Sequence, residues 1–402
     1  MTHRVRGEVA ALCLVLATAA AAEVPHVQNG ASPLEAPRTL QLRELWRAGG
    51  EESELIFGSV AGALAGPDGQ LFVLDSQLSQ VIVFSPDGKH LRTIGREGDG
   101  PGETRRPSGL MLLPDGALGL IQAFPGKVVK LQPDGLPAGS FTVGSGDQAQ
   151  GRFSVLVEGQ CRGEAVVMAG MHMTMAPDGT SNQRHFLARV APDGRQLQTY
   201  ATADWTINYA DFELSEKGLN FVYGRWALGP DERVYAPAER NRYCLQVFAP
   251  DGHLERTFGR DYTPWRRDAA AATAARQSLA AVGRNYPAPP RRLVSEENEA
   301  DILGVWVSPA GEIWVTPSRG VYEVPAGTRA VMDVFDAQGR FVRQARLVGP
   351  GDPRRDAMYF VRADRVVVVT GALDAYLTQM GVSGEGGQAP TLELICYALE
   401  PR

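Results

Sequence analysis

The sequence repeats a short pattern of turns, and this repeat constrains the fold more than any other feature. Glycines that close Pro-Asp-Gly turns lie 19 residues apart at Gly69 and Gly88, and again 19 residues apart at Gly116 and Gly135. The whole unit recurs after 47 residues, from Gly69 to Gly116. A fixed period of this length is typical of propellers and solenoids.

The first unit predicts four short strands. Residues 60–64, 71–74, 81–84 and 91–94 are mostly apolar or β-branched, and tight turns separate them. In such turns Gly supplies a positive φ, and Asp bonds to its own backbone. Four antiparallel strands joined by tight turns form one propeller blade.

Further units follow with insertions of variable length, so we predict an all-β fold, a single six-bladed β-propeller of four-stranded antiparallel blades over residues 38–400. The sixth unit supplies only three strands. Residues 39–46 alternate between apolar and polar side chains, and we predict that this N-terminal strand completes the last blade beside residues 392–398. The alternative is an N-terminal segment without order.

The N-terminal residues 1–22 resemble a secretory signal peptide. Basic residues precede a short apolar run, and small residues offer a cleavage point near Ala22. The run is too short to span a membrane as a permanent helix, so we predict a periplasmic or extracellular protein. Cys13 suggests lipid attachment, but it lies in the middle of the apolar run. Residues 23–37 contain three prolines and are predicted to be a flexible mature N-terminus.

Charge disfavours one class of partner. Without residues 1–22 the chain has 38 basic and 45 acidic residues, a formal charge of −7. No basic excess is present to replace phosphate counterions, so nucleic acid is not an expected partner. The chain outside the signal peptide has three cysteines, Cys161, Cys244 and Cys396, which allow at most one internal disulfide. We interpret them as buried apolar side chains.

Three strings carry a resemblance to a known family. They are Leu71–Asp75, Val81–Phe84 with its Pro-Asp-Gly turn, and the sequence Gly-Arg-Glu-Gly-Asp-Gly-Pro-Gly-Glu at 95–103. Together they resemble the bacterial six-bladed β-propeller family related to NHL-repeat proteins. The resemblance implies the fold, leaves the activity unassigned, and implies binding of proteins or peptides as the commonest role.

The long insertions are predicted to share one rim of the propeller. In an up-and-down blade, the loops between the second and third strands and the links between blades emerge on the same side, and they carry function on a rigid scaffold. They comprise residues 95–107, 144–155, 169–184, 201–223, 259–303, 316–330 and 370–391. The insertion at 259–303 is predicted to be partly helical. It is either a lid over the central channel or a cover for a blade edge.

This insertion rim is rich in arginine and aromatic residues, which suit sugars, peptides, aromatic ligands and carboxylates. The candidate ligand-binding residues are Arg96, Trp205, Tyr223, Arg225, Arg240, Arg242, Trp265 and Arg319. We therefore predict a secreted or periplasmic scaffold that binds a protein, peptide or small ligand on this rim. The sequence makes no prediction of oligomeric state.

No catalytic or cofactor motif stands out. A His-Glu-x-x-His metal motif and a Gly-x-Ser-x-Gly elbow are both absent from the sequence, and no cofactor is predicted. The positions aligned with Asp75 at the ends of the second strands include Ala238 and Pro317, a poor set of metal ligands. His172 lies among three methionines, which leaves a copper patch as a minor alternative. The alternative function is a lactonase- or lyase-like hydrolase with a divalent metal at the channel mouth.

Overall fold

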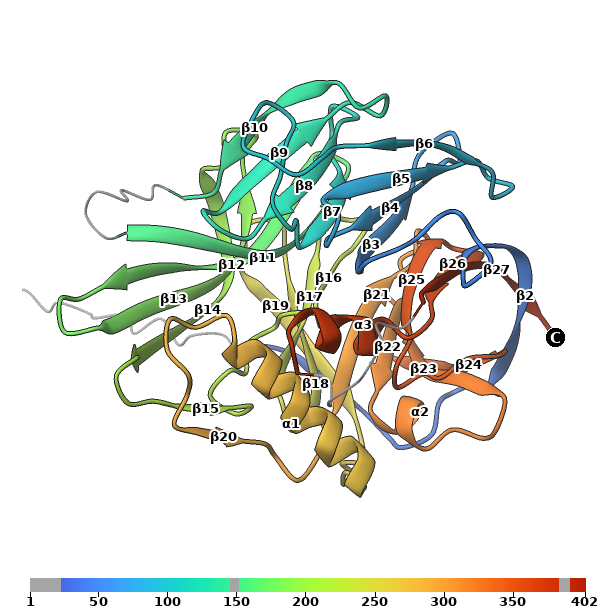
Figure 1. The fold of residues 1–402 in the computed structure, drawn as a ribbon. Helices are drawn as coiled ribbons and strands as arrows, with labels where there is room; N and C mark the ends of the chain where they lie inside the picture. The colour runs from blue at the N-terminus through green and yellow to red at the C-terminus, as the bar shows by residue number, and fades with distance from the viewer. Residues whose placement is uncertain (1–22, 145–151, 383–390) are drawn as a thin grey trace, which may run out of the picture.

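The computed structural model describes residues 23–144, 152–382 and 391–402, which form an all-β propeller (Figure 1). The predicted signal peptide at 1–22 lies outside these residues. The described strands form three four-stranded sheets, a five-stranded sheet, an eight-stranded sheet and one two-stranded pair. In Figure 1 the larger sheets stand around a common centre.

The first sheet has the strands and turns that the repeat predicts. Its antiparallel order is β3 (Val60–Ala65), β4 (Leu71–Asp75), β5 (Gln80–Phe84) and β6 (His90–Ile94). Gly69 and Gly88 have φ values of 84° and 87°, a region that side chains other than glycine rarely adopt. β4 is buried along its whole length, which explains its unbroken apolar sequence before Asp75.

The remaining sheets repeat this order. Two further quartets are β7 (Gly109–Leu112), β8 (Leu118–Gln122), β9 (Lys127–Leu131) and β10 (Pro137–Thr142), and then β11 (Arg152–Arg162), β12 (Ala165–Met175), β13 (Thr180–Val190) and β14 (Gln196–Asn208). The five-stranded sheet contains β16 (Ala227–Leu228), β17 (Val234–Glu239), β18 (Arg242–Phe248), β19 (Leu254–Arg260) and the outer strand β1 (His26–Asn29).

The eight-stranded sheet contains the last two quartets, where a strand from the N-terminal part of the chain meets one from the C-terminal part. One quartet is β21 (Ile302–Val307), β22 (Ile313–Pro317), β23 (Thr328–Phe335) and β24 (Phe341–Val348). The other is β25 (Ala357–Arg362), β26 (Arg365–Val369), β27 (Glu393–Pro401) and β2 (Arg38–Gly49).

β2 closes the ring as the alternation of its sequence predicts. It pairs antiparallel with β27 from Leu40 opposite Pro401 to Gly49 opposite Glu393. At its start it also lies parallel to β24, and this short contact joins the two quartets. The first and last quartets share one core, in which Val73 and Phe84 are buried with Leu394.

The prediction that residues 23–37 are flexible is wrong. β1 pairs in parallel with β19, and the backbone of Leu34 and Glu35 donates to carbonyls of β24. Asn29 fixes the turn between them, because its amide donates to the Gly259 and Gly339 carbonyls at 2.8 and 2.9 Å. Prolines lack the backbone donor that a central strand needs, but an outer strand tolerates them.

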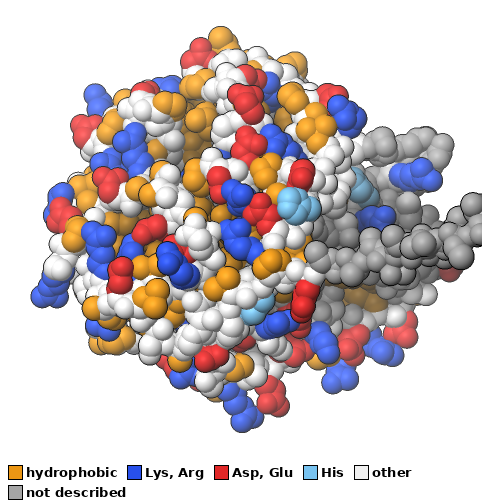
Figure 2. Space-filling view, turned by 180° about the vertical axis from the view of Figure 1, so that it is seen from behind, with side chains coloured by type: hydrophobic (Ala, Val, Ile, Leu, Met, Phe, Trp, Pro, Cys, Tyr) orange, Lys and Arg blue, Asp and Glu red, His pale blue; other side chains and the backbone are white. Residues whose placement is uncertain are grey.

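Surface charge agrees with the composition. On the face shown in Figure 2, basic and acidic side chains alternate and no extended patch of one sign is present. Among the described residues no helix has the length and apolar sequence needed to cross a membrane. Cys244 and Cys396 are buried, Cys161 is partly buried, and all three are free thiols.

Candidate functional site

A cavity of about 690 Å³ lies where the links between the later sheets converge. Its walls come from the link between β15 (Glu213–Ser215) and β16, the β17–β18 loop, the β19–β21 insertion, α2 (Arg319–Tyr322), the β24–β25 link and α3 (Ala372–Gln379). All of these segments belong to the insertion rim. The structure therefore brings several of the long insertions together around one space.

α1 (Ala269–Gly283) forms one side of this cavity and matches the helix predicted within 259–303. Asp268 caps its N-terminus by accepting from the Ala271 amide at 2.8 Å. The helix presents Ala270, Ala274 and Ala275 to the cavity, and these short side chains leave room beneath it. The two predicted roles of this helix are a lid over the central channel and a cover for a blade edge. The structure places α1 at the cavity and in contact with α3.

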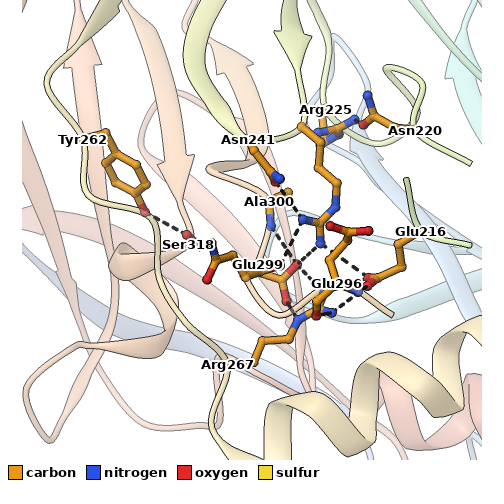
Figure 3. A network of polar contacts seen from close by, with 12 residues as sticks. Glu216, Asn220, Arg225, Asn241, Tyr262, Arg267, Glu296, Glu299, Ala300 and Ser318 are labelled. Carbon is orange, nitrogen blue, oxygen red and sulfur yellow. Dashed lines mark hydrogen bonds and ion pairs between the residues drawn. The ribbon is translucent and has the colours of Figure 1, made fainter. Parts of the chain in front are cut away.

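A buried ion cluster anchors the start of α1 to the propeller (Figure 3). Arg267 donates two hydrogen bonds to Glu216 at 2.6 and 2.7 Å and two to Glu299 at 2.9 and 2.8 Å. Only 3% of the Arg267 side chain is exposed. Burial disfavours the charge of Glu216, but the bonds from Arg267 outweigh it and lower the pKa of this carboxyl.

Two further arginines extend the cluster into the cavity wall. Arg240 donates to the Asn241 side chain at 2.9 Å and the Asn298 carbonyl at 3.0 Å, and lies 3.5 and 3.6 Å from the two carboxylates of the cluster. Arg225 donates from Nη2 to the Asn220 side chain at 2.7 Å, whereas its Nη1 is buried without a partner among the described residues. Burial first, and then the charge of Arg240, lower the pKa of Arg225 to about 10.

Tyr223 connects the cavity wall to a buried histidine. Its hydroxyl donates to the Gly170 carbonyl at 2.8 Å and lies 2.7 Å from Nδ1 of His185. His185 is fully buried, with its ring centroid 3.6 Å from that of Trp205. Burial lowers the pKa of His185 to about 4, so the imidazole is neutral at pH 7.

This histidine predicts a loss of stability in acid. Because its folded pKa lies below the ordinary value of 6.5, the unfolded chain binds more protons between pH 6.5 and 4, and the free energy of unfolding falls as the pH drops through that window. We expect the wild type to lose about 2–3 kcal/mol more than His185→Gln over this window. Urea unfolding of both proteins at several pH values measures the difference, and parallel pH profiles would contradict the assignment.

Three of the eight candidate residues, Tyr223, Arg225 and Arg240, line the cavity. The other five lie outside its lining and have separate contacts. Arg96 pairs with Glu103, Arg242 with Glu239 and Arg319 with Glu323 at the surface, Trp205 packs on His185, and Trp265 is buried in a stack on Tyr322.

The insertion predicted at 169–184 is not a loop. β12 and β13 extend through it as a long hairpin, so most of its residues have strand partners. The turn at its tip is Pro177-Asp178-Gly179. A Pro-Asp-Gly turn therefore joins the second and third strands of this sheet and lies on the insertion rim. The segments 144–155 and 370–391 lie partly outside the described residues.

The positions considered for a metal have other partners. His172 lies 2.9 Å from both the Ser154 hydroxyl and the Gln196 amide nitrogen, and its ring stacks on Phe186. The Asp75 carboxylate accepts from backbone amides, including that of Gly58 at 2.6 Å. Within 23–144, 152–382 and 391–402, no group of three or more His, Cys, Asp or Glu side chains is arranged to hold a metal ion.

Sequence reasoning missed the residues that build the cavity wall. Arg267, Glu216 and Glu299 come from different parts of the chain, and each alone reads as an ordinary surface charge. Asp268 was the available signal, because an Asp before an alanine-rich run predicts the start of a helix. That signal locates α1 but not the carboxylates that Arg267 meets.

Comparisons with known proteins bear on the fold. A family model described as a 6-bladed β-propeller matches residues 59–130, which is less than half of the chain. No curated protein matches the sequence significantly. The relationship to NHL-repeat proteins is not shown by these matches.

Solved structures give distant likenesses. A gluconolactonase from Xanthomonas campestris is 14% identical, with 85% of this chain and 87% of that chain covered and a TM-score of 0.41. An inactive virginiamycin B lyase from Staphylococcus aureus with quinupristin is 9% identical, covering 89% and 94%, with a TM-score of 0.43. Regucalcin from Agrobacterium tumefaciens, a calcium-binding protein, is 12% identical, covering 91% and 97%, with a TM-score of 0.38. At these scores nothing about activity is inferred, and the strand pairing itself defines the chain as an all-β propeller.

Proposed function

We propose that this protein is an exported six-bladed β-propeller that binds a ligand in the cavity beneath α1 and α3. Six blades follow if the two quartets of the eight-stranded sheet are counted separately and β1 is an added outer strand. The matched family description agrees with this count. Export is supported by the signal-like sequence at 1–22.

One observation carries the binding proposal: several insertions of one rim surround a single cavity of about 690 Å³. That volume is within the range of small-molecule sites, and the lining combines apolar side chains with nine charged ones, most of them in ion pairs. Buried contacts hold this wall in place, because Arg267 ties α1 to the propeller and Tyr223 is fixed by His185. Such a wall is formed before a ligand arrives, which lowers the ordering cost of binding.

Filling the cavity tests this proposal. In Ala274→Phe a ring replaces a methyl group that lines the cavity, whereas in Thr273→Phe the same ring is placed on the exposed side of α1. We expect at least one compound in a thermal-shift screen of sugars, lactones, organic acids and short peptides to raise the Tm of the wild type and Thr273→Phe. The same compound should not raise the Tm of Ala274→Phe. Equal shifts in all three proteins would place binding elsewhere, and a screen without shifts would count against a binding role.

The metal-dependent hydrolase stays the alternative, but no specific contact in the structure favours it. Metal analysis of the purified protein separates the two functions. Close to one equivalent of a divalent metal, together with hydrolysis of a lactone that a chelator abolishes, would replace the binding proposal.

A further inference from the structure

The charges around the cavity do not cancel evenly. Five arginines and four carboxylates line it, and most of them pair with each other or with neighbours. Arg267 occupies the carboxylates of Glu216 and Glu299, whereas Arg355 pairs with Asp374. Arg354 pairs with the Asp268 cap at 3.2 Å.

Arg225 is the exception, because it is the lining arginine without an ion pair to a carboxylate among the described residues. Its Nη2 is already used by the Asn220 side chain and by the backbone, and its buried Nη1 has no acceptor. A buried charged donor left without a partner is costly.

The surrounding loop fixes this guanidinium at the cavity. Glu158 accepts from the Gly224 amide at 2.8 Å and from the Trp226 indole at 2.7 Å, so both neighbours of Arg225 in the sequence are held by one carboxylate. The Arg225 amide itself donates to the Val222 carbonyl. The loop therefore holds the charge in place instead of leaving it free to turn into solvent.

A second positive charge adds to the first. Arg240 lines the same cavity and lies close enough to Arg225 to oppose its ionisation, whereas the carboxylates of Glu158 and Glu299 favour it to a smaller extent. Its carboxylate neighbours Glu216 and Glu299 already have their strongest bonds with Arg267 (Figure 3). An anion placed in the cavity beside Arg225 and Arg240 would relieve the repulsion between the two guanidinium groups.

The part of the wall beside Arg225 and under α1 is largely apolar. Phe221 and Tyr223 flank Arg225, and the Tyr223 hydroxyl is occupied by His185 and the Gly170 carbonyl, so its ring is the part left for a ligand. The alanine side of α1 and Leu279 face the same space. A molecule bound beside Arg225 thus meets a positive charge together with apolar side chains.

We propose that the cavity selects small organic acids, with the carboxylate held beside the guanidinium groups of Arg225 and Arg240 and an apolar or aromatic body packed between Phe221, Tyr223 and the alanine side of α1. This inference rests on the proposed function and narrows its ligand class. Arg225 sets the specificity in this scheme, and Arg240 adds to the attraction.

Paired probes test this selection. Butanoate, 3-phenylpropanoate and indole-3-acetate are each titrated by calorimetry beside the corresponding primary amide, which has nearly the same shape without the charge. For the wild type we expect the best acid to bind about 10–100-fold more tightly than its amide, as for a charged hydrogen bond in a desolvated site. Arg225→Gln should lose that preference.

Arg242→Gln is the matched control, because it removes the same charge from an exposed arginine that lies off the cavity lining. It should keep the wild-type preference. If Arg225→Gln does not fold, Arg225→Lys replaces it, and a reduced preference for acids is expected because a lysine has no planar fork.

The outcomes separate the two proposals. If acids and amides bind the wild type equally, and Ala274→Phe abolishes both, ligand binding in the cavity stands and selection of acids is overturned. A preference for acids that survives in the Arg225 variant also overturns the role of this residue. If none of the six probes binds the wild type, selection of acids is overturned, and the broader screen then decides whether the cavity binds anything.

Discussion

A chain that begins at residue 50, and so lacks β1 and β2, is expected to lose the closed propeller. β2 supplies the outer partner of β27 along almost its whole length, and its Leu40 and Leu42 are 5% and 4% exposed. Each of these side chains stabilises the fold by about 1.5–3 kcal/mol through burial. Without β2, β27 becomes an uncovered edge with unpaired backbone groups, which promotes aggregation.

A chain that begins at residue 38 is the matched control. It lacks β1 and the turn after it but keeps β2 and the core between the first and last quartets. We expect it to remain soluble and to unfold cooperatively, with a lower free energy of unfolding than the chain that begins at residue 23. Size-exclusion chromatography and urea unfolding followed by tryptophan fluorescence distinguish the three lengths. Cooperative unfolding at the same midpoint in the shortest chain would show that β2 does not close the ring.

Arg267→Met is expected to be the most damaging single substitution at the candidate site. The change removes the guanidinium that neutralises Glu216 and Glu299, whose side chains are 19% and 13% exposed. Removing one partner of a buried ion cluster leaves uncompensated charge and costs about 3–5 kcal/mol. The neighbouring Arg266→Met should cost less than about 1 kcal/mol, because Arg266 pairs with Glu297 at the surface.

The pH dependence of this effect identifies its cause. Arg267 lowers the pKa of Glu216, so this part of the stability is present above the unfolded pKa near 4.5 and disappears as the pH falls below it. The difference between wild type and Arg267→Met should therefore shrink in acid. A difference that stays constant as the pH falls from 7 to about 3, well below the unfolded pKa, would instead indicate lost packing.

The repeating sheets could be predicted from the sequence because their signals are local. A turn such as Pro67-Asp68-Gly69 specifies its own backbone, and the number of strands in the last unit pointed to β2 as the missing one. β1 gave no such signal. Its position depends on Asn29, which meets the Gly259 and Gly339 carbonyls far along the chain, and no local pattern encodes that pairing.

The candidate site was predicted only in part for the same reason. Tyr223, Arg225 and Arg240 were found because residue type and rim position together favour binding. The contact of Arg267 with Glu216 joins two different links, and its contact with Glu299 joins the two ends of one long insertion, so both pairings depend on the assembled propeller. Trp205 and Trp265 satisfied the same two criteria, but their rings pack against His185 and Tyr322 instead of lining the cavity.

The position of β2 also sets an order of events during synthesis. Arg43 and Glu400 are neighbours in the finished sheet although 357 positions separate them in the chain. β2 is therefore synthesised early and stays without its partner β27 until nearly the whole polypeptide has left the ribosome. Contacts of such long range slow folding. In the export that we propose, this delay would keep the ring open until the last residues have crossed the membrane.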